Sequence, residues 1–163
     1  MEVEVLSIRP TYFTREGYKK LKDELDFLKG QKRREISKQI GEARAHGDIS
    51  ENAEYDAAKE AQAHVERRIA ELEPKLANFR IIEDENFPDD KVYIGSKVKL
   101  LDCESDEEVC YFLVGPEEAD YKDGKISTTA PVGKALLGHE VGDLVEVKTP
   151  NGVREYEILE ISR

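Results

Sequence analysis

The sequence predicts an α+β protein, in which an N-terminal antiparallel α-helical coiled-coil hairpin precedes a small, mostly antiparallel β domain with one short helix. Apolar residues recur at helical spacing over two long segments. After Phe79 this pattern gives way to short apolar runs separated by Gly, Pro and Asp. We expect an N-terminal extension over residues 1–13, the hairpin over 14–80 with its tip at 46–52, a linker over 81–90 and the β domain over 91–163.

Each arm of the predicted hairpin carries one apolar stripe. The stripe of the first arm contains Leu21, Leu25, Leu28, Ile36, Ile40 and Ala43, and that of the second contains Ala57, Ala61, Val65, Ile69, Leu72, Leu76 and Phe79. Charged and amide residues fill the other positions, as expected for a narrow seam between two solvated helices. Gly47 is a natural end for the first arm. Thr14 is a candidate N-cap, but Gly17 stands where a capping box would have an acidic residue.

The predicted β domain is read from its apolar runs and its turns. The runs are Val92 to Ile94, Lys97 to Leu101, Val109 to Val114, Lys125 to Ser127, Leu144 to Lys148 and Glu155 to Ile161. Asn151-Gly152 between the last two indicates a β-hairpin. Pro131 near a first turn and Gly138 past an end predict a short helix from Pro131 to Leu137.

Composition excludes several classes of function. The net charge of −11 argues against broad nucleic-acid binding through bulk charge. No apolar run approaches the length of a membrane span, and residues 1–10 lack the pattern of a signal peptide, so we expect a cytoplasmic protein that binds no membrane. Cys103 and Cys110, without His partners, do not make a zinc site. We expect them to be reduced and to face each other across a β-hairpin.

The hairpin tip carries the candidate metal-binding residues. Asp48 and Glu51 are three residues apart, so at the start of a helix they can lie on one face and share a divalent cation. One or two carboxylates, completed by water and phosphate, suit Mg²⁺. The same pair also fits a structural role, with Asp48 as N-cap and Glu51 at the third helical position. The spacing alone leaves both interpretations open.

The tip, from Gly47-Asp48-Ile49-Ser50-Glu51 through Tyr55, resembles that of the Gre transcript cleavage factors, in particular their GreA-like branch. The C-terminal half carries a matching pattern in Ile126-Ser127, Pro131 to His139 and Gly142-Asp143, and Thr14, Gly17, Leu21, Glu24 and Leu25 fit the family's opening.

The resemblance implies a fold and a partner. The β domain would be FKBP-like and would dock at the secondary channel of bacterial RNA polymerase, with Ser127, Pro131 and Gly133 as candidate docking residues. The hairpin would enter the channel, where the 3′ end of a backtracked RNA is extruded. Asp48 and Glu51 would there hold a Mg²⁺ shared with the polymerase. Asn52, Glu54 and Tyr55 would support the tip.

The resemblance also implies an accessory role, because the polymerase provides the other metal and its ligands. The chain would be a monomeric elongation factor that activates RNA cleavage by the polymerase, thereby rescuing arrested complexes, and not a self-sufficient enzyme. Two alternatives remain. One is a secondary-channel inhibitor without cleavage, which has no need of metal ligands at this spacing, and the other is a prolyl isomerase with a helical arm.

A basic band is predicted midway along the hairpin if paired residues have numbers that sum to about 100. Its members are Lys32, Arg33, Arg34, Lys38, Arg67 and Arg68. The band either guides extruded RNA through phosphate contacts or is an ordinary solvated helix face.

Overall fold

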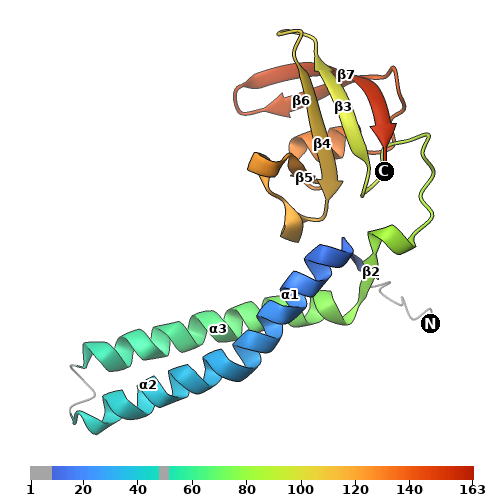
Figure 1. Cartoon of the computed structure of the whole chain (residues 1–163). Coiled ribbons are helices and arrows are strands. Elements are labelled where there is room, and N and C mark those ends of the chain that lie inside the picture. Colours follow the sequence, from blue (N-terminus) through green and yellow to red (C-terminus); the bar gives the residue numbers. More distant parts are fainter. Residues whose placement is uncertain (1–8, 48–51) are drawn as a thin grey trace, which may run out of the picture. The chain divides into compact units, whose positions relative to one another are not determined.

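The hairpin arms are built from helices whose apolar stripes face one another. The computed structural model describes residues 9–47 and 52–163 (Figure 1). The first arm contains α1 (Arg15–Phe27), a π-helical stretch (Leu28–Lys32) and α2 (Arg33–Ala45), and the second arm is α3 (Ala53–Ala77). The two arms lie side by side and run in opposite directions (Figure 1). The predicted helical hairpin is therefore confirmed.

The π-helical stretch explains an irregularity in the first apolar stripe. Leu28 and Ile36 are eight residues apart, which is one residue more than two helical turns. A π-helical segment accommodates one extra residue within an α-helix. Residues on either side of Leu28–Lys32 consequently keep the same face of the arm, and Leu28 packs against the cluster that contains Ile36.

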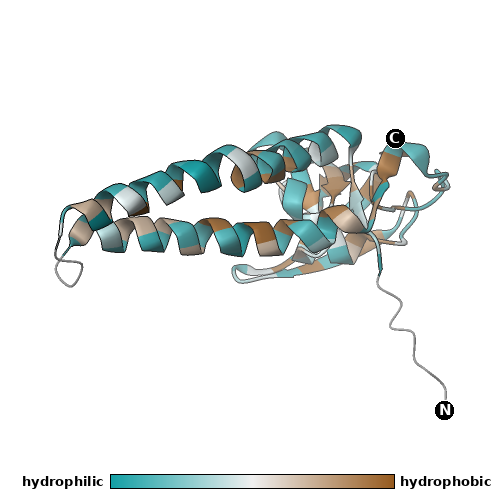
Figure 2. Cartoon of the chain, turned by 90° about the horizontal axis from the view of Figure 1, so that it is seen from below, coloured by the Kyte–Doolittle hydropathy of each residue, from teal (hydrophilic) through white to brown (hydrophobic). Residues whose placement is uncertain are grey.

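The seam between the arms is narrow. Its buried cluster consists of Ile36, Ile40, Ala58, Val65 and Ile69. Hydrophilic residues dominate the remaining surface of the arms, as the teal colour in Figure 2 shows. Within the part of the hairpin that the structure describes, the core thus follows one line of apolar side chains, as the periodicity predicted.

The C-terminal sheet has the strand order β5-β4-β3-β7-β6. Its strands are β3 (Lys97–Asp102), β4 (Glu108–Val114), β5 (Lys125–Ser127), β6 (Leu144–Thr149) and β7 (Gly152–Ser162). All neighbours are antiparallel except β4 and β5, which are parallel. The helix α4 (Pro131–Leu136) has Pro131 in its first turn, as predicted. The α+β class is confirmed, and the sheet is mostly antiparallel, as predicted, with one parallel pair.

The core of this sheet contains one segment that was predicted incorrectly. Val92 is fully buried with Leu100, Leu113, Leu136 and Ile158. The predicted strand from Val92 to Ile94 does not form, because Val92 bonds instead to the chain after α4. Its N–H donates to His139 O at 2.9 Å, and its carbonyl accepts from Gly138 N at 2.8 Å.

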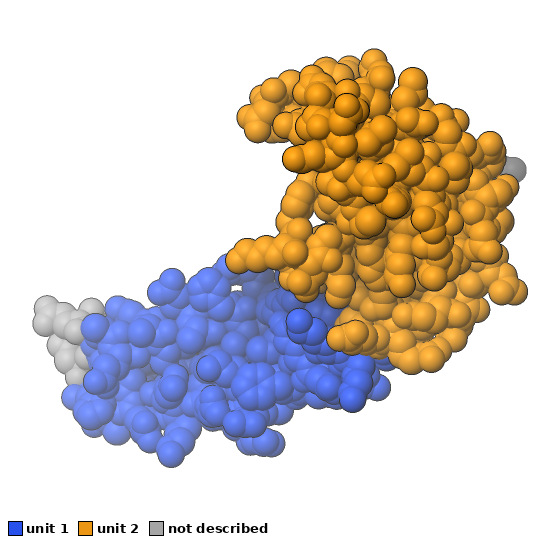
Figure 3. All heavy atoms as spheres, turned by 45° about the horizontal axis from the view of Figure 1, so that its top comes forward, with its two compact units in different colours: residues 1–9, 18–78 blue, residues 10–17, 79–163 orange. Residues whose placement is uncertain are grey.

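A second, two-stranded sheet was not predicted. Strand β1 (Thr11–Phe13) pairs in parallel with β2 (Phe79–Ile81), with Thr11 opposite Phe79. Phe13 is 1% exposed. The chain accordingly divides into a helical unit, Tyr18–Asn78, and a second unit that combines Pro10–Gly17 with Phe79–Arg163 (Figure 3).

Among the helices in the described ranges, none combines the length and the hydropathy needed to cross a bilayer.

Candidate functional site at the hairpin tip

Asn52, the last residue of the tip, joins the two arms. Its side-chain N–H donates to the carbonyl of Ala43 at 2.6 Å, near the end of α2. Its side-chain oxygen accepts from the amides of Glu54 at 3.0 Å and Tyr55 at 3.2 Å, in the first turn of α3. One amide group therefore caps the second arm and ties it to the first.

This geometry bears on both interpretations of the acidic pair, because each of them placed Asp48 and Glu51 at the start of a helix. The N-cap of α3 is Asn52, and the helix begins at Ala53. The alternative in which Asp48 caps this helix, with Glu51 in its first turn, is therefore wrong. Asp48 and Glu51 themselves lie outside the described residues.

The described residues that border the tip complete both helix ends. Gly47 has a φ of 102°, and its N–H donates to Arg44 O at 3.3 Å, as expected of a glycine that ends a helix. The Arg44 guanidinium lies 6.0 Å from the ring centroid of Tyr55, which also packs against the seam. His46 Nε2 lies 3.6 Å from a carboxylate oxygen of Glu54. The tip thus connects two helix ends that are bonded to each other.

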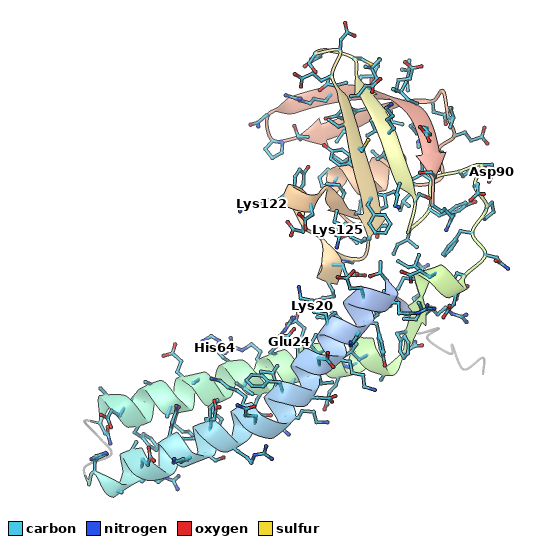
Figure 4. The ribbon with its side chains drawn as sticks, in the orientation of Figure 1. Lys20, Glu24, His64, Asp90, Lys122 and Lys125 are labelled. Carbon is cyan, nitrogen blue, oxygen red and sulfur yellow. The ribbon has the colours of Figure 1, made fainter. Side chains whose placement is uncertain are left out.

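The basic band is partly neutralised across the seam. Arg33 forms two hydrogen bonds of 2.8 Å with the carboxylate of Glu66, which raise the pKa of Arg33 and lower that of Glu66. Arg68 forms a similar pair with Glu24, at 2.8 and 3.2 Å. Figure 4 labels Glu24 on its arm. Two of the predicted RNA-guiding arginines are therefore already occupied by carboxylates.

The other members of the band are more available for contact with phosphate groups. Lys32 and Lys38 each lie 3.8 Å from a carboxylate on their own helix, Glu35 and Glu42. Such exposed pairs are weak. The sequence reasoning missed the acidic partners Glu24 and Glu66, although the pairing sum had already placed Arg33 opposite residues close to Glu66.

The three candidate docking residues lie together at the junction of β5 and α4. The Ser127 hydroxyl lies 2.7 Å from the Thr129 hydroxyl and accepts from Thr129 N at 3.1 Å. Gly133 is buried, and a Cβ there would overlap the carbonyl oxygen of Ser127. Pro131 is exposed. Ser127 and Gly133 thus have structural roles, and Pro131 presents the accessible surface.

The cysteines do not face each other across the β3–β4 hairpin, so that prediction is wrong. Cys110 in β4 is paired with Lys99, whereas Cys103 follows the end of β3 and donates its N–H to Glu155 O. Both thiols are free and exposed.

Comparison with known proteins gives two family matches. Residues 11–81 match the family described as "Transcription elongation factor, N-terminal". Residues 87–163 match that described as "Transcription elongation factor, GreA/GreB, C-term". The chain belongs to the GreA/GreB family of transcription elongation factors.

The similarity to individual GreA/GreB proteins covers almost the whole chain. The transcription elongation factor GreA of Chloroherpeton thalassium is 54% identical over 93% of this chain and 96% of its own length. That of Acetivibrio thermocellus is 53% identical over 92% and 94%. Among solved structures, GreA factor homolog 1 of Thermus thermophilus is 34% identical, covers 95% of this chain and 100% of that chain, and has a TM-score of 0.44.

Proposed function

We propose that this Gre-type elongation factor inserts its hairpin into the secondary channel of bacterial RNA polymerase. There it stimulates Mg²⁺-dependent endonucleolytic cleavage of backtracked nascent RNA. The observation that carries the proposal is the position of Asp48 and Glu51 between Gly47 and Asn52, the two residues that complete the adjoining helix ends. In this role the factor works as a cytoplasmic monomer and is accessory to the polymerase.

The donor set at the tip fits Mg²⁺. Carboxylate oxygens are hard ligands, and Mg²⁺ is commonly bound by one or two carboxylates together with water and phosphate oxygens. Asp48 and Glu51 would hold the ion jointly with the polymerase, which contributes the remaining ligands. The chemistry that the shared ion would supply there is activation of a water molecule for in-line attack on a phosphodiester.

The described residues divide the remaining tasks. Asn52, which follows the acidic pair in the sequence, keeps the two arms joined. Because Arg33 and Arg68 are paired with carboxylates, contact with extruded RNA phosphates falls mainly to Lys32, Arg34, Lys38 and Arg67. Exposed Pro131 at the start of α4 is the docking residue best placed to touch the polymerase.

The proposal is tested by RNA cleavage in a stalled, backtracked polymerase complex. The wild type is compared with Asp48→Asn plus Glu51→Gln. Short 3′ RNA fragments are expected with the wild type only, while both proteins bind the polymerase equally. A matched control is Asp26→Asn plus Glu60→Gln, which removes the same charge from exposed positions on the arms and is expected to cleave like wild type.

Other outcomes have defined meanings. If the wild type binds and slows the polymerase without releasing fragments, the chain is an inhibitor of the secondary channel. If the tip variant cleaves as well as the wild type, Asp48 and Glu51 are not the metal ligands. Absence of binding would contradict the proposed partner.

A further inference from the structure

The start of α1 is capped by a residue from a distant part of the chain. Thr14 Oγ1 accepts from Gly17 N at 3.0 Å, which is the first half of a capping box. The second half normally comes from an acidic residue at the third helical position, which is Gly17 here. Glu118, 104 residues away in sequence, accepts from Thr14 N at 2.8 Å and also bonds the Thr14 hydroxyl. Glu118 thus takes the place of the missing acid.

A second carboxylate strengthens this attachment. Glu83 accepts from the amide of Arg15 at 3.0 Å, and the Arg15 guanidinium lies 2.6 Å from a carboxylate oxygen of Asp84. The first turn of α1 therefore has two backbone N–H groups bonded to carboxylates. Negative charge at a helix N-terminus is also favoured by the helix dipole.

Gly17 makes room for the cap. A Cβ on Gly17 would overlap the carboxylate of Glu118. The backbone φ of Gly17 lies outside the left-handed region. The backbone conformation at this position would accept alanine. The glycine is therefore explained by the approach of Glu118 and by nothing in its own backbone.

The cap lies close to the boundary between the two units of the chain, which falls within α1. Residues Pro10–Gly17 belong to the same unit as Glu83 and Glu118, whereas the helical unit resumes at Tyr18. Yet α1 is one helix over Arg15–Phe27. The first turn, held by Glu118, is thus continuous with the arm that leads to the tip.

We propose that Glu118 is a positioning residue for the tip. Because α1 continues from the turn that Glu118 caps into the helical unit, the cap keeps the start of this helix formed, and so raises the fraction of bound complexes with a correctly placed tip. The proposal rests on the cleavage function proposed above. It predicts a loss of cleavage rate without a loss of docking.

The cap itself is tested in the isolated protein with Glu118→Ala, Gly17→Ala and their combination. Glu118→Ala is expected to accelerate amide exchange at Thr14 by about tenfold or more, since a hydrogen bond to a charged group is lost. Gly17→Ala is expected to lower the thermal midpoint when Glu118 is present. In the Glu118→Ala background the same change is expected to raise the midpoint, because alanine favours a helix more than glycine does.

The positioning role is tested in backtracked polymerase complexes. Glu118→Ala is expected to lower the maximal cleavage rate at saturating factor by roughly fivefold, the factor that corresponds to one lost helix cap. The half-saturating concentration is expected to stay at its wild-type value. Glu146→Ala, which removes an exposed carboxylate from β6, is expected to change neither quantity.

Each failure is distinguishable. If Glu118→Ala leaves amide exchange at Thr14 unchanged, Glu118 does not cap α1. The same holds if Gly17→Ala lowers the thermal midpoint both with and without Glu118. Faster exchange with an unchanged maximal rate overturns the positioning role. If the wild type gives no RNA fragments while exchange and the reversal behave as expected, the cleavage function fails and the positioning role fails with it, but the cap stands.

Discussion

At the scale of single residues, Asp102 shows how one carboxylate organises a turn. It is 4% exposed at the end of β3. It accepts from Glu104 N at 2.9 Å, from Ser105 N at 3.4 Å and from the Arg154 guanidinium at 3.0 Å. These interactions, led by the amide of Glu104, lower the pKa of Asp102 because they favour the ionised form.

The lowered pKa predicts a defined pH dependence for Asp102→Asn. A carboxyl group whose pKa is lower in the folded protein stabilises it above the unfolded pKa of about 3.9, and this contribution is lost as the pH falls through the folded pKa. We expect Asp102→Asn to lower the free energy of unfolding at pH 7, because hydrogen bonds to a charged group are lost. The difference should narrow below about pH 4. Urea unfolding across this range measures it.

The control for this prediction is Asp123→Asn, which changes an exposed carboxylate in the same unit and is expected to have little effect at any pH. A deficit of Asp102→Asn that stays constant down to acid pH would show that packing or hydrogen-bond geometry, and not charge, is responsible.

At the scale of elements, two helical glycines have opposite surroundings. Nothing lies within 4 Å of a Cβ placed on Gly41 in α2. In α4, a Cβ on Gly133 would overlap the backbone of Ser127 at the end of β5. The first glycine only weakens its helix, whereas the second permits α4 to approach the sheet.

We therefore expect alanine to act in opposite directions at these two positions. Gly41→Ala should raise the free energy of unfolding by about 0.5–1 kcal/mol, because glycine loses more backbone entropy on folding. Gly133→Ala should lower it by about 1–3 kcal/mol, because α4 must shift away from β5. Chemical denaturation of both variants measures the two effects, and each serves as the control for the other. Equal signs would contradict the local packing described here.

The sequence predicted those elements whose signals are local. Helical periodicity located both arms, Gly47 and Gly138 marked helix ends, and Asn151-Gly152 marked the turn between β6 and β7. The two parallel pairs were not predicted, since β1, β2 and β5 have only three residues each and pair with distant segments. Periodicity has no information on such pairing.

The candidate site shows the same limit. The acidic pair was visible as a motif, and Asn52 was named as a supporting residue, but the sequence did not show which carboxylate partners the arginines would have. The sequence also has Gly17 where a capping box would have an acidic residue, so half of the box is missing from the local sequence. Glu118 completes the capping box only through the tertiary structure. Local spacing cannot predict a partner that is 104 residues away in the sequence.

At the scale of the whole molecule, the two units have cores of different kinds. The β-sheet unit surrounds a cluster that includes Leu100, Leu113, Leu136 and Ile158, each 0% exposed. The hairpin has one line of contacts between two helices, and its buried cluster is the smaller set Ile36, Ile40, Ala58, Val65 and Ile69. Local stability follows the density of buried apolar contacts.

We expect native-state hydrogen exchange to reflect this difference. Amides of β3, β4 and β7 should exchange most slowly, through global unfolding of their unit, and amides along α2 and α3 should exchange faster through smaller openings. Residue-resolved exchange in low denaturant measures both classes. Uniform protection across the two units would show instead that the chain unfolds as a single cooperative structure.

The Asn52 cap separates the chemistry of the tip from the stability of the arms. Gly47 ends one helix and Asn52 caps the other, so described residues on either side of positions 48–51 complete both helix ends. The two helices can then be regarded as a scaffold on which the residues of the tip can vary. Substitutions at residues 48–51 can add, remove or replace a reactive group while the scaffold that carries it persists, which allows one architecture to acquire divergent activities by changes confined to its tip.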